Sequence, residues 1–410
     1  MDLPKIYTVH QQFEDTSIKD VAGTVRKEFS KFNPGEKIKN GQSVAVGVAS
    51  RGTHDLQILV KTTIDCLKEM GLKPFVIPAM GSHGGGTGEG QEEVLKDLGI
   101  SKEQVGAEIV SSMDVVSLGK IQAGAEVFMA KDAILADHIV VINRVKPHTA
   151  FRSDVESGLC KILAVGCGRQ IGAENMHRYD LAKTIVPAAE LILEKTPVLC
   201  GLAVTENAMG GTHSLKLANP EEFADVDREF LKTAWEIFPK LPLDDLDVLI
   251  VDEIGKNVSG AGMDPNVVGF WRREGGVRKP DYRVLVTLDL TPQSHGNATG
   301  LGFVDLTSKR LISMVDWQAT YLNSLTCGVF RASRMPIPLE NDLEVVETAV
   351  SRTPEIEKIR LARIVNTGSL ETFWVSKELI PELQAKKGID VEKEALDFGF
   401  DESGRILPMH

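Results

Sequence analysis

The chain has 410 residues, of which 42% are apolar and 25% are charged, and its formal net charge is −12. This composition is typical of a folded globular protein and excludes a disordered chain. The acidic balance argues against a dedicated nucleic-acid binder, because neutralising phosphates requires clustered lysines and arginines. At roughly 150 residues per domain, the length predicts two or three domains.

The sequence gives no sign of a membrane span or a secretory signal. No run approaches the ~18 consecutive apolar residues that cross a bilayer. The first residues, MDLPKIYTVHQQ, lack a basic segment followed by an apolar core. Five cysteines without a CxxC pair indicate a reducing compartment, so we expect a cytoplasmic protein.

The order of strand and helix patterns predicts an α/β fold. Short, apolar, valine-rich runs are typical of buried strands. In the first half of the chain such runs lie at 43–50, 73–80, 138–148 and 198–211. A helical pattern at 53–70 separates the first two runs. After a linker near residue 240, a second set begins with 247–255 and continues with 282–290 and 362–369. We therefore predict two Rossmann-like α/β domains, residues 1–240 and 241–410.

A glycine-rich loop, Gly81–Gly88, follows the strand predicted at 73–80. Glycines at a strand-to-helix turn let the main chain approach a ligand closely, and Gly84 and Gly85 are the candidates for such contact. The loop matches no named phosphate-binding motif, and a flexible turn is the alternative. His83 favours a functional role, because an imidazole among glycines has little to pack against.

A second histidine, His148, follows the strand predicted at 138–148, in the segment Lys-Pro-His-Thr. His83 and His148 would then lie at carboxyl ends of strands in one sheet, where open α/β sheets bind ligands. Two histidines at such an edge can serve as acid and base. The alternative is that both are ordinary loop histidines.

Lys161 lies in the apolar, small-residue stretch SGLCKILAVGCG, and His177 follows sixteen residues later. Burial favours the neutral amine and makes a lysine nucleophilic, although Lys161 can equally extend to solvent at a helix edge. The neighbouring Cys160 and Cys167 are interpreted as packing residues.

Candidates for substrate binding lie in the second half. Lys256 begins a loop of short polar residues and glycines, and Arg272 follows it in Trp-Arg-Arg. Arginine presents a fork that grips a carboxylate. The alternative is a solvated surface pair, which we favour slightly more for Arg273 than for Arg272.

Taken in order, GSHGG, KPH and the lysine of SGLCKILAVGCG with a histidine sixteen residues on resemble the lactate racemase (LarA) family. The resemblance implies two α/β domains with the active site between them, and a nickel-pincer nucleotide as cofactor. It implies that His177 binds nickel and that Lys161 can bond covalently to the cofactor. It implies His83 and His148 as acid and base, and Arg51 as a further cofactor contact.

The implied activity is racemisation or epimerisation of a 2-hydroxy acid. Hydride passes reversibly to the cofactor while the histidines move the hydroxyl proton, and other proteins must make the cofactor. Three features depart from lactate racemase itself. The interval from His148 to Lys161 is three residues longer than expected, Val48 stands where an acidic residue is expected, and the carboxylate-binding Gln and Lys fall at Gly269 and Arg272. These departures suggest a larger hydroxy acid than lactate.

Two other functions remain open at this stage. One is a zinc-dependent hydrolase or lyase that uses His83, His148 and His177, although these histidines lack the local spacing of common zinc motifs. The other is a non-catalytic protein that binds a nucleotide cofactor. In all three cases we expect small-molecule ligands and neither nucleic acid nor membrane as partner.

Overall fold

The computed structural model describes residues 2–50 and 53–409. Its chain forms two compact units. One is Glu14–Phe238, the 14–238 unit. The other consists of Met1–Phe13 and Pro239–His410 and is called the C-terminal unit.

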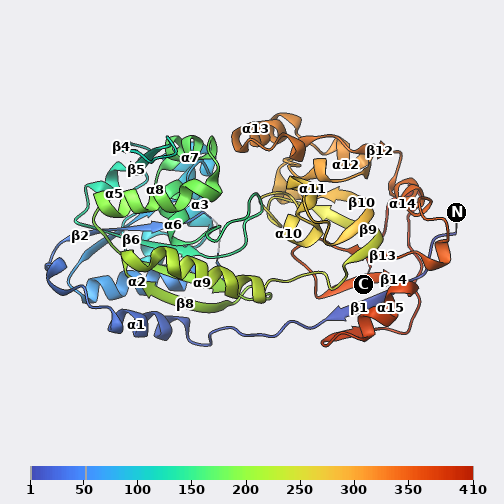
Figure 1. Cartoon of the computed structure of the whole chain (residues 1–410), viewed down its shortest axis with the longest axis horizontal. Helices are drawn as coiled ribbons and strands as arrows, with labels where there is room; N and C mark the ends of the chain where they lie inside the picture. Colours follow the sequence, from blue (N-terminus) through green and yellow to red (C-terminus); the bar gives the residue numbers. More distant parts are fainter. Residues whose placement is uncertain (1, 51–52, 410) are drawn as a thin grey trace. The chain divides into compact units, whose positions relative to one another are not determined.

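The 14–238 unit is built on a five-stranded sheet (Figure 1). Its strands lie in the order β3-β2-β6-β7-β8, and all are parallel except the edge strand β8. They are β2 (Ser43–Val48), β3 (Lys73–Pro78), β6 (His138–Arg144), β7 (Val198–Glu206) and β8 (Thr212–Ala218). A separate hairpin pairs β4 (Val115–Lys120) with β5 (Glu126–Ala130). The strands predicted at 43–50, 73–80 and 138–148 are thus present, and β7 forms the first part of the run predicted at 198–211. The antiparallel partner of β7, strand β8, was not predicted.

The helices of this unit are α1 (Val21–Lys31), α2 (Leu56–Glu69), α3 (Gly88–Asp97), α4 (Lys102–Val105), α5 (Lys131–Ile134), α6 (Leu159–Lys161), α7 (Arg169–His177), α8 (Leu181–Lys195) and α9 (Phe223–Glu236). Short 3-10 turns lie at η1 (Gly35–Lys37), η2 (Gly84–Gly86) and η4 (Pro220–Glu222). Between α6 and α7 the chain forms one π-helical turn, η3 (Ile162–Gly166).

The alternation of side chains along the central strands explains the layers. Val44, Val46 and Val48 of β2 pack with buried residues of α1 and α2, whereas Ala45 packs with those of α6, η3 and α8. Successive residues of a strand point to opposite faces, so a fully apolar strand needs cover on both sides. In Figure 1, α1 and α2 lie on one side of this sheet, and α5 and α8 lie on the other.

The C-terminal unit contains an eight-stranded mixed sheet in the order β12-β11-β10-β9-β13-β14-β1-β15. The first five are parallel, and β14, β1 and β15 pair antiparallel. The strands are β9 (Asp245–Ile254), β10 (Asp281–Leu290), β11 (Leu306–Ser308), β12 (Ile337–Leu339), β13 (Leu361–Ile364), β14 (Thr372–Ser376), β15 (Ile389–Val391) and β1 (Ile6–Gln11). Strands were predicted at 247–255, 282–290 and 362–369, and β9, β10 and β13 lie there.

The helices of the C-terminal unit are α10 (Pro265–Val268), α11 (Trp271–Glu274), α12 (Lys309–Ser313), α13 (Trp317–Cys327), α14 (Asp342–Val350) and α15 (Ile380–Gln384). The 3-10 turns are η5 (Pro292–Ser294), η6 (Leu301–Phe303), η7 (Phe330–Ser333), η8 (Ile356–Lys358) and η9 (Lys377–Leu379). Together with the other unit, this arrangement confirms the predicted α/β class.

The first strand belongs to the C-terminal unit, which differs from the predicted domain limits of 1–240 and 241–410. β1 lies between β14 and β15, and Ile6 and Val9 are fully buried there. The prediction divided the chain once, because a single sequence shows the apolar character of β1 and not its partners. The chain thus enters the 14–238 unit from β1 and returns to the same sheet after Phe238.

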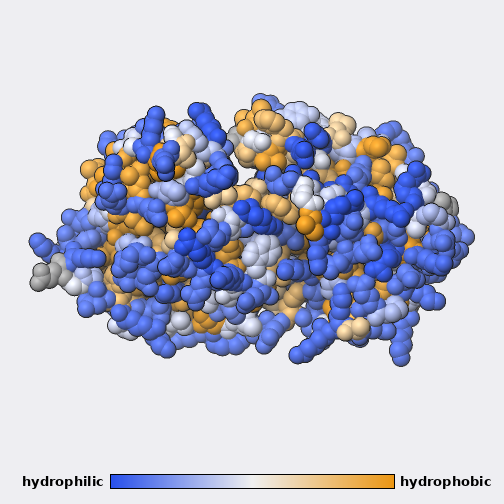
Figure 2. Space-filling view, in the orientation of Figure 1, coloured by the Kyte–Doolittle hydropathy of each residue, from blue (hydrophilic) through white to orange (hydrophobic). Residues whose placement is uncertain are grey.

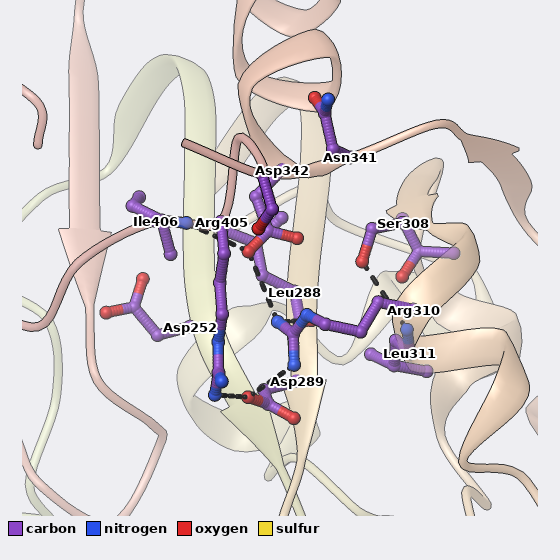
Figure 3. A network of polar contacts seen from close by, with 12 residues as sticks. Asp252, Leu288, Asp289, Ser308, Arg310, Leu311, Asn341, Asp342, Arg405 and Ile406 are labelled. Atoms are coloured by element: carbon purple, nitrogen blue, oxygen red, sulfur yellow. Dashed lines mark hydrogen bonds and ion pairs between the residues drawn. The ribbon is translucent and has the colours of Figure 1, made fainter. Parts of the chain in front are cut away.

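The last residues of the C-terminal unit are held by a polar network (Figure 3). Arg310 donates to Asp289 at 2.8 Å and to the buried Asp342 at 3.2 Å. Arg405 reaches Asp289 at 3.2 Å, and the main-chain N–H of Ile406 donates to Asp342 at 3.1 Å. The C-terminal segment is therefore fixed to β10 and α14.

The surface seen in Figure 2 is largely hydrophilic, with an apolar area over α13. Tyr321, Leu322 and Leu325 of that helix are exposed, as is Phe330. Within residues 2–50 and 53–409, no helix combines the length and the apolar character that membrane crossing requires.

The position of β1 gives a test. Ile6→Ala removes a fully buried side chain and should lower the stability of the C-terminal unit by about 2–5 kcal/mol. Hydrogen exchange should then speed up in β13 and β14. Ile64→Ala, at an equally buried site on α2, should instead affect β2 and β3. Faster exchange in the 14–238 unit after Ile6→Ala would contradict the assignment of β1.

Candidate functional site

The carboxyl edge of the five-stranded sheet carries both predicted histidines. β3 and β6 flank β2 and run parallel to it, so their carboxyl ends meet at one edge. His83 follows β3, and His148 follows β6. Arg144 at the end of β6 forms an ion pair there with Glu206 at the end of β7. The loops that carry His83 and His148 thus lie at the same edge of the sheet, as the sequence predicted.

The loop around His83 has a defined conformation. Gly84, Gly85 and Gly86 all have positive φ, between 63° and 67°, which side chains rarely adopt. A Cβ on Gly84 would lie 2.5 Å from the main chain of Gly90, so this glycine is required by packing on α3. A Cβ on Gly85 would meet nothing within 4 Å, so Gly85 is the position with room for a ligand.

His83 is exposed, and its Nδ1 forms a hydrogen bond with the hydroxyl of Ser50, which follows β2. A hydroxyl can donate or accept, so this contact allows either tautomer of the ring. The loop also packs on α7, because a Cβ on Gly81 would come within 3.0 Å of Ala173.

His148 is half-buried and more firmly defined. Its Nδ1 accepts the main-chain N–H of Ala150 at 3.0 Å, so the neutral ring carries its proton on Nε2. Its own main-chain N–H donates to the buried Glu156 at 2.7 Å. Burial raises the pKa of Glu156, although Arg152 and the main-chain bonds oppose that rise.

Lys161 and His177 come together, and His148 is joined to them through Phe151. The ring of Phe151 lies 4.4 Å from that of His148, and the Nζ of Lys161 lies 5.7 Å from the same phenyl ring. Part of the surface of His177 is exposed to solvent, but protein atoms surround much of its ring. Loss of surrounding water, and next the charge of Lys161, lower the pKa of His177 to about 4. His177 is therefore neutral at neutral pH, the form that binds metals.

A buried carboxylate, Asp227 of α9, orients the chain before Lys161. It accepts the main-chain N–H groups of Leu159 and Cys160, both at 2.8 Å. Gly158, with φ of 90°, leaves the space that the carboxylate occupies. Burial outweighs these bonds and raises the pKa of Asp227 to about 7. Asp227 thus caps the start of α6, and sequence reasoning missed it because it lies 67 residues beyond Cys160.

The predicted packing role of the cysteines agrees with their burial. Cys160 and Cys167 are almost fully buried, and neither forms a disulfide. Burial raises the pKa of the Cys167 thiol to about 12, so it does not ionise at neutral pH. Arg51, predicted to contact the cofactor, lies outside the described residues.

The two predicted substrate residues lie in the C-terminal unit and differ in their surroundings. Lys256 donates to the carbonyl of Gly260 at 2.7 Å and to Asn323 of α13 at 2.6 Å. Arg272 makes two bonds to Asp305, at 2.8 and 2.6 Å, and its guanidinium lies against Trp271 and Tyr282.

Arg272 is thus paired with a carboxylate of the chain itself, and its predicted contact with substrate stays a prediction. Its neighbour Arg273, interpreted as the more solvated of the two, is 6% exposed. At Gly269, where the resemblance implies a carboxylate-binding Gln, φ is 106° and a Cβ would press on the indole of Trp271. The geometry of the main chain therefore explains that glycine.

The comparisons with known proteins agree with this arrangement. The family described as the lactate racemase N-terminal domain matches residues 14–158. Residues 14–158 of this chain are thus similar to that domain of the lactate racemase family. The matched segment starts where the 14–238 unit starts, and it includes His83 and His148 but not Lys161 or His177. No match was found among curated proteins.

One solved structure extends the likeness of fold. The lactate racemase apoprotein from Thermoanaerobacterium thermosaccharolyticum is similar over 89% of this chain and 99% of that chain, with a TM-score of 0.54 and 13% identity. At this identity the likeness concerns the fold alone. We now call residues 14–238 the racemase-like unit.

The donor set near Lys161 decides which kind of metal site is chemically suitable. One imidazole beside one amine fits a metal that arrives with an organic group supplying its other ligands. Among the described residues, no three His, Cys, Asp or Glu side chains are grouped so that they could hold a metal ion. The zinc alternative therefore lacks the ligand cluster that a site built only from this chain requires.

Asp227 gives a pH-dependent test. Because its pKa is raised in the folded state, to about 7, the folded protein binds this proton more tightly than the unfolded chain. Asp227 should therefore lower the stability of the racemase-like unit as the pH rises from about 4 to about 7. Urea unfolding should show wild type losing stability relative to Asp227→Asn over that interval, and no further above it. A constant difference would contradict the raised pKa.

Proposed function

We propose that this protein is a racemase or epimerase of a 2-hydroxy acid that works with a nickel-pincer nucleotide. The grouping of His148, Phe151, Lys161 and His177 beside the His83 loop carries the proposal. The family match at residues 14–158 supports it from the sequence side. The proposal assigns an isomerase activity and leaves the substrate open to a 2-hydroxy acid other than lactate.

His177 would bind the nickel, since its imidazole is neutral and exposed. Lys161 would hold the organic part of the cofactor, with Gly85 leaving room for it along the loop. When bound, the cofactor would supply a reversible acceptor for the hydride of the substrate. The residues of this chain would supply position and proton transfer.

The two histidines differ in how each would handle the hydroxyl proton. His83 can accept it at Nε2 when Ser50 accepts a hydrogen bond from Nδ1. His148 carries its own proton on Nε2, because Nδ1 accepts from Ala150. His148 is therefore prepared to donate to the carbonyl oxygen of the keto acid, and His83 to accept from the hydroxyl. Both roles are required in one turnover, because the hydroxyl proton is removed as the keto acid forms and a proton must be returned to its carbonyl oxygen.

The first experiment measures nickel and mass. The protein would be produced together with the enzymes that make the cofactor, and nickel determined per chain. We expect about one nickel per chain in wild type, loss of nickel in His177→Ala, and full retention in the control His138→Ala, because His138 lies at the opposite end of β6. A mass increment that disappears in Lys161→Ala would mark a covalent link. Zinc in place of nickel would contradict the proposal.

The second experiment tests the proton-transfer roles. His83→Asn and His148→Asn should each lower the kcat of racemisation by about 10²–10⁴-fold, while nickel content is unchanged. A screen of 2-hydroxy acids with one and two carboxylates would identify the substrate first. Racemisation at the wild-type rate in either variant would show that the acid and base have been assigned wrongly.

A further inference from the structure

An arginine with an unusual conformation begins the helix that ends at His177. Arg169 is the first residue of α7 and is fully buried. Its φ is 55°, in the left-handed region, although it is not a glycine. Such a conformation is unfavourable for a residue with a side chain, because its Cβ approaches the following carbonyl oxygen. Strain of this kind persists where the surrounding structure requires it, and it is frequent near functional sites.

The guanidinium of Arg169 has few partners. Its NH1 donates to the carbonyl of Pro78, at the end of β3, and to Oε1 of Gln91 at 3.2 Å. Its Nε and NH2 make no hydrogen bond within residues 2–50 and 53–409, and a carboxylate oxygen of Asp132 lies 3.9 Å from NH2. Burial accordingly lowers the pKa of Arg169. A buried cation with one bonded nitrogen contributes little net stability, because desolvation opposes its contacts.

Gln91 of α3 connects this arginine to the loop of the first histidine. It is fully buried, and its Nε2 donates to the carbonyl of Gly81 at 2.7 Å and to that of His83 at 3.3 Å. Its other amide atom, Oε1, accepts from Arg169. The amide cannot rotate without losing both sets of contacts, so Arg169 determines which end of Gln91 faces His83.

We propose that Arg169 is a positioning residue that fixes the main chain at His83 through Gln91. The inference rests on the proposed function only for the role of His83, since the contacts themselves need no cofactor. It gives α7 two tasks, because the helix holds the acid/base loop at its first residue and the metal ligand at its last. It also explains why a strained, buried arginine stands where an apolar residue would pack more favourably.

Arg363 of the C-terminal unit provides a matched control. It is also fully buried, and it forms an ion pair with Asp252 at 2.8 Å. Arg363→Met removes a buried arginine by the same substitution, in a unit whose described contacts offer no route to His83. Gln91→Met breaks the connection while leaving the arginine in place, so it tests the inference even where an arginine variant fails to fold.

The test observes the ring of His83 in cofactor-free protein. The chain has nine histidines, and protein labelled with ¹³C at the histidine rings gives a resolvable set of NMR signals. His83→Asn identifies the signal of His83. We expect this signal to shift or broaden in Gln91→Met and Arg169→Met, to recover in part in Arg169→Lys, and to stay in place in Arg363→Met. An unchanged His83 signal in folded Gln91→Met overturns the inference.

Kinetics of the loaded enzyme supply the second readout. A displaced acid/base group should lower kcat by about tenfold to hundredfold and leave KM nearly unchanged. Equal kcat in Gln91→Met and wild type overturns the inference. If wild type racemises no 2-hydroxy acid, the proposed function fails, whereas the NMR result still decides whether Arg169 and Gln91 position His83.

Discussion

Two buried carboxylates hold the connection on which the candidate site depends. Glu156 accepts the main-chain N–H of His148, and Asp227 accepts those of Leu159 and Cys160. The hydroxyl of Ser157 donates to the carbonyl of Lys146 at 2.7 Å and so joins the two ends of the loop between these residues. Without these acceptors, buried main-chain donors would be left unpaired, at about 1–3 kcal/mol each. Without these contacts, little would hold the connection from β6 to α6 in the conformation that places His148 and Lys161 on either side of Phe151.

These contacts show why the site is precise although it is built largely from loops. The carboxyl ends of parallel strands determine where each loop begins, and buried side chains determine how it continues. Gln91 does for the glycine-rich loop what Glu156 does for the segment after β6, since each bonds the main chain at a histidine. The imidazole of His83 is exposed and that of His148 is half-buried, whereas Gln91 and Glu156 are buried. The main chain at both histidines is thus fixed by side chains that lie below the surface.

The sequence predicted the elements better than their partners. The valine-rich runs of β2 and β6 predicted strands because they are short and rich in β-branched residues, as is typical of parallel strands buried on both faces. The shared edge of His83 and His148 followed from that order. The contacts of Asp227 with Leu159, of Gln91 with Arg169 and of Arg272 with Asp305 were not predictable, because each joins segments far apart in sequence. The unit to which β1 belongs was missed for the same reason.

The position of β1 also has a consequence for synthesis of the chain on the ribosome. The racemase-like unit is complete once Phe238 has emerged, and it can fold at that point. β1, made first, pairs with Thr372–Ser376 and Ile389–Val391, which are made last. At roughly 5–20 residues per second, Ile6 and Val9 remain exposed for tens of seconds before their partners exist. These two apolar side chains therefore lack their partners for most of the time in which the chain is made.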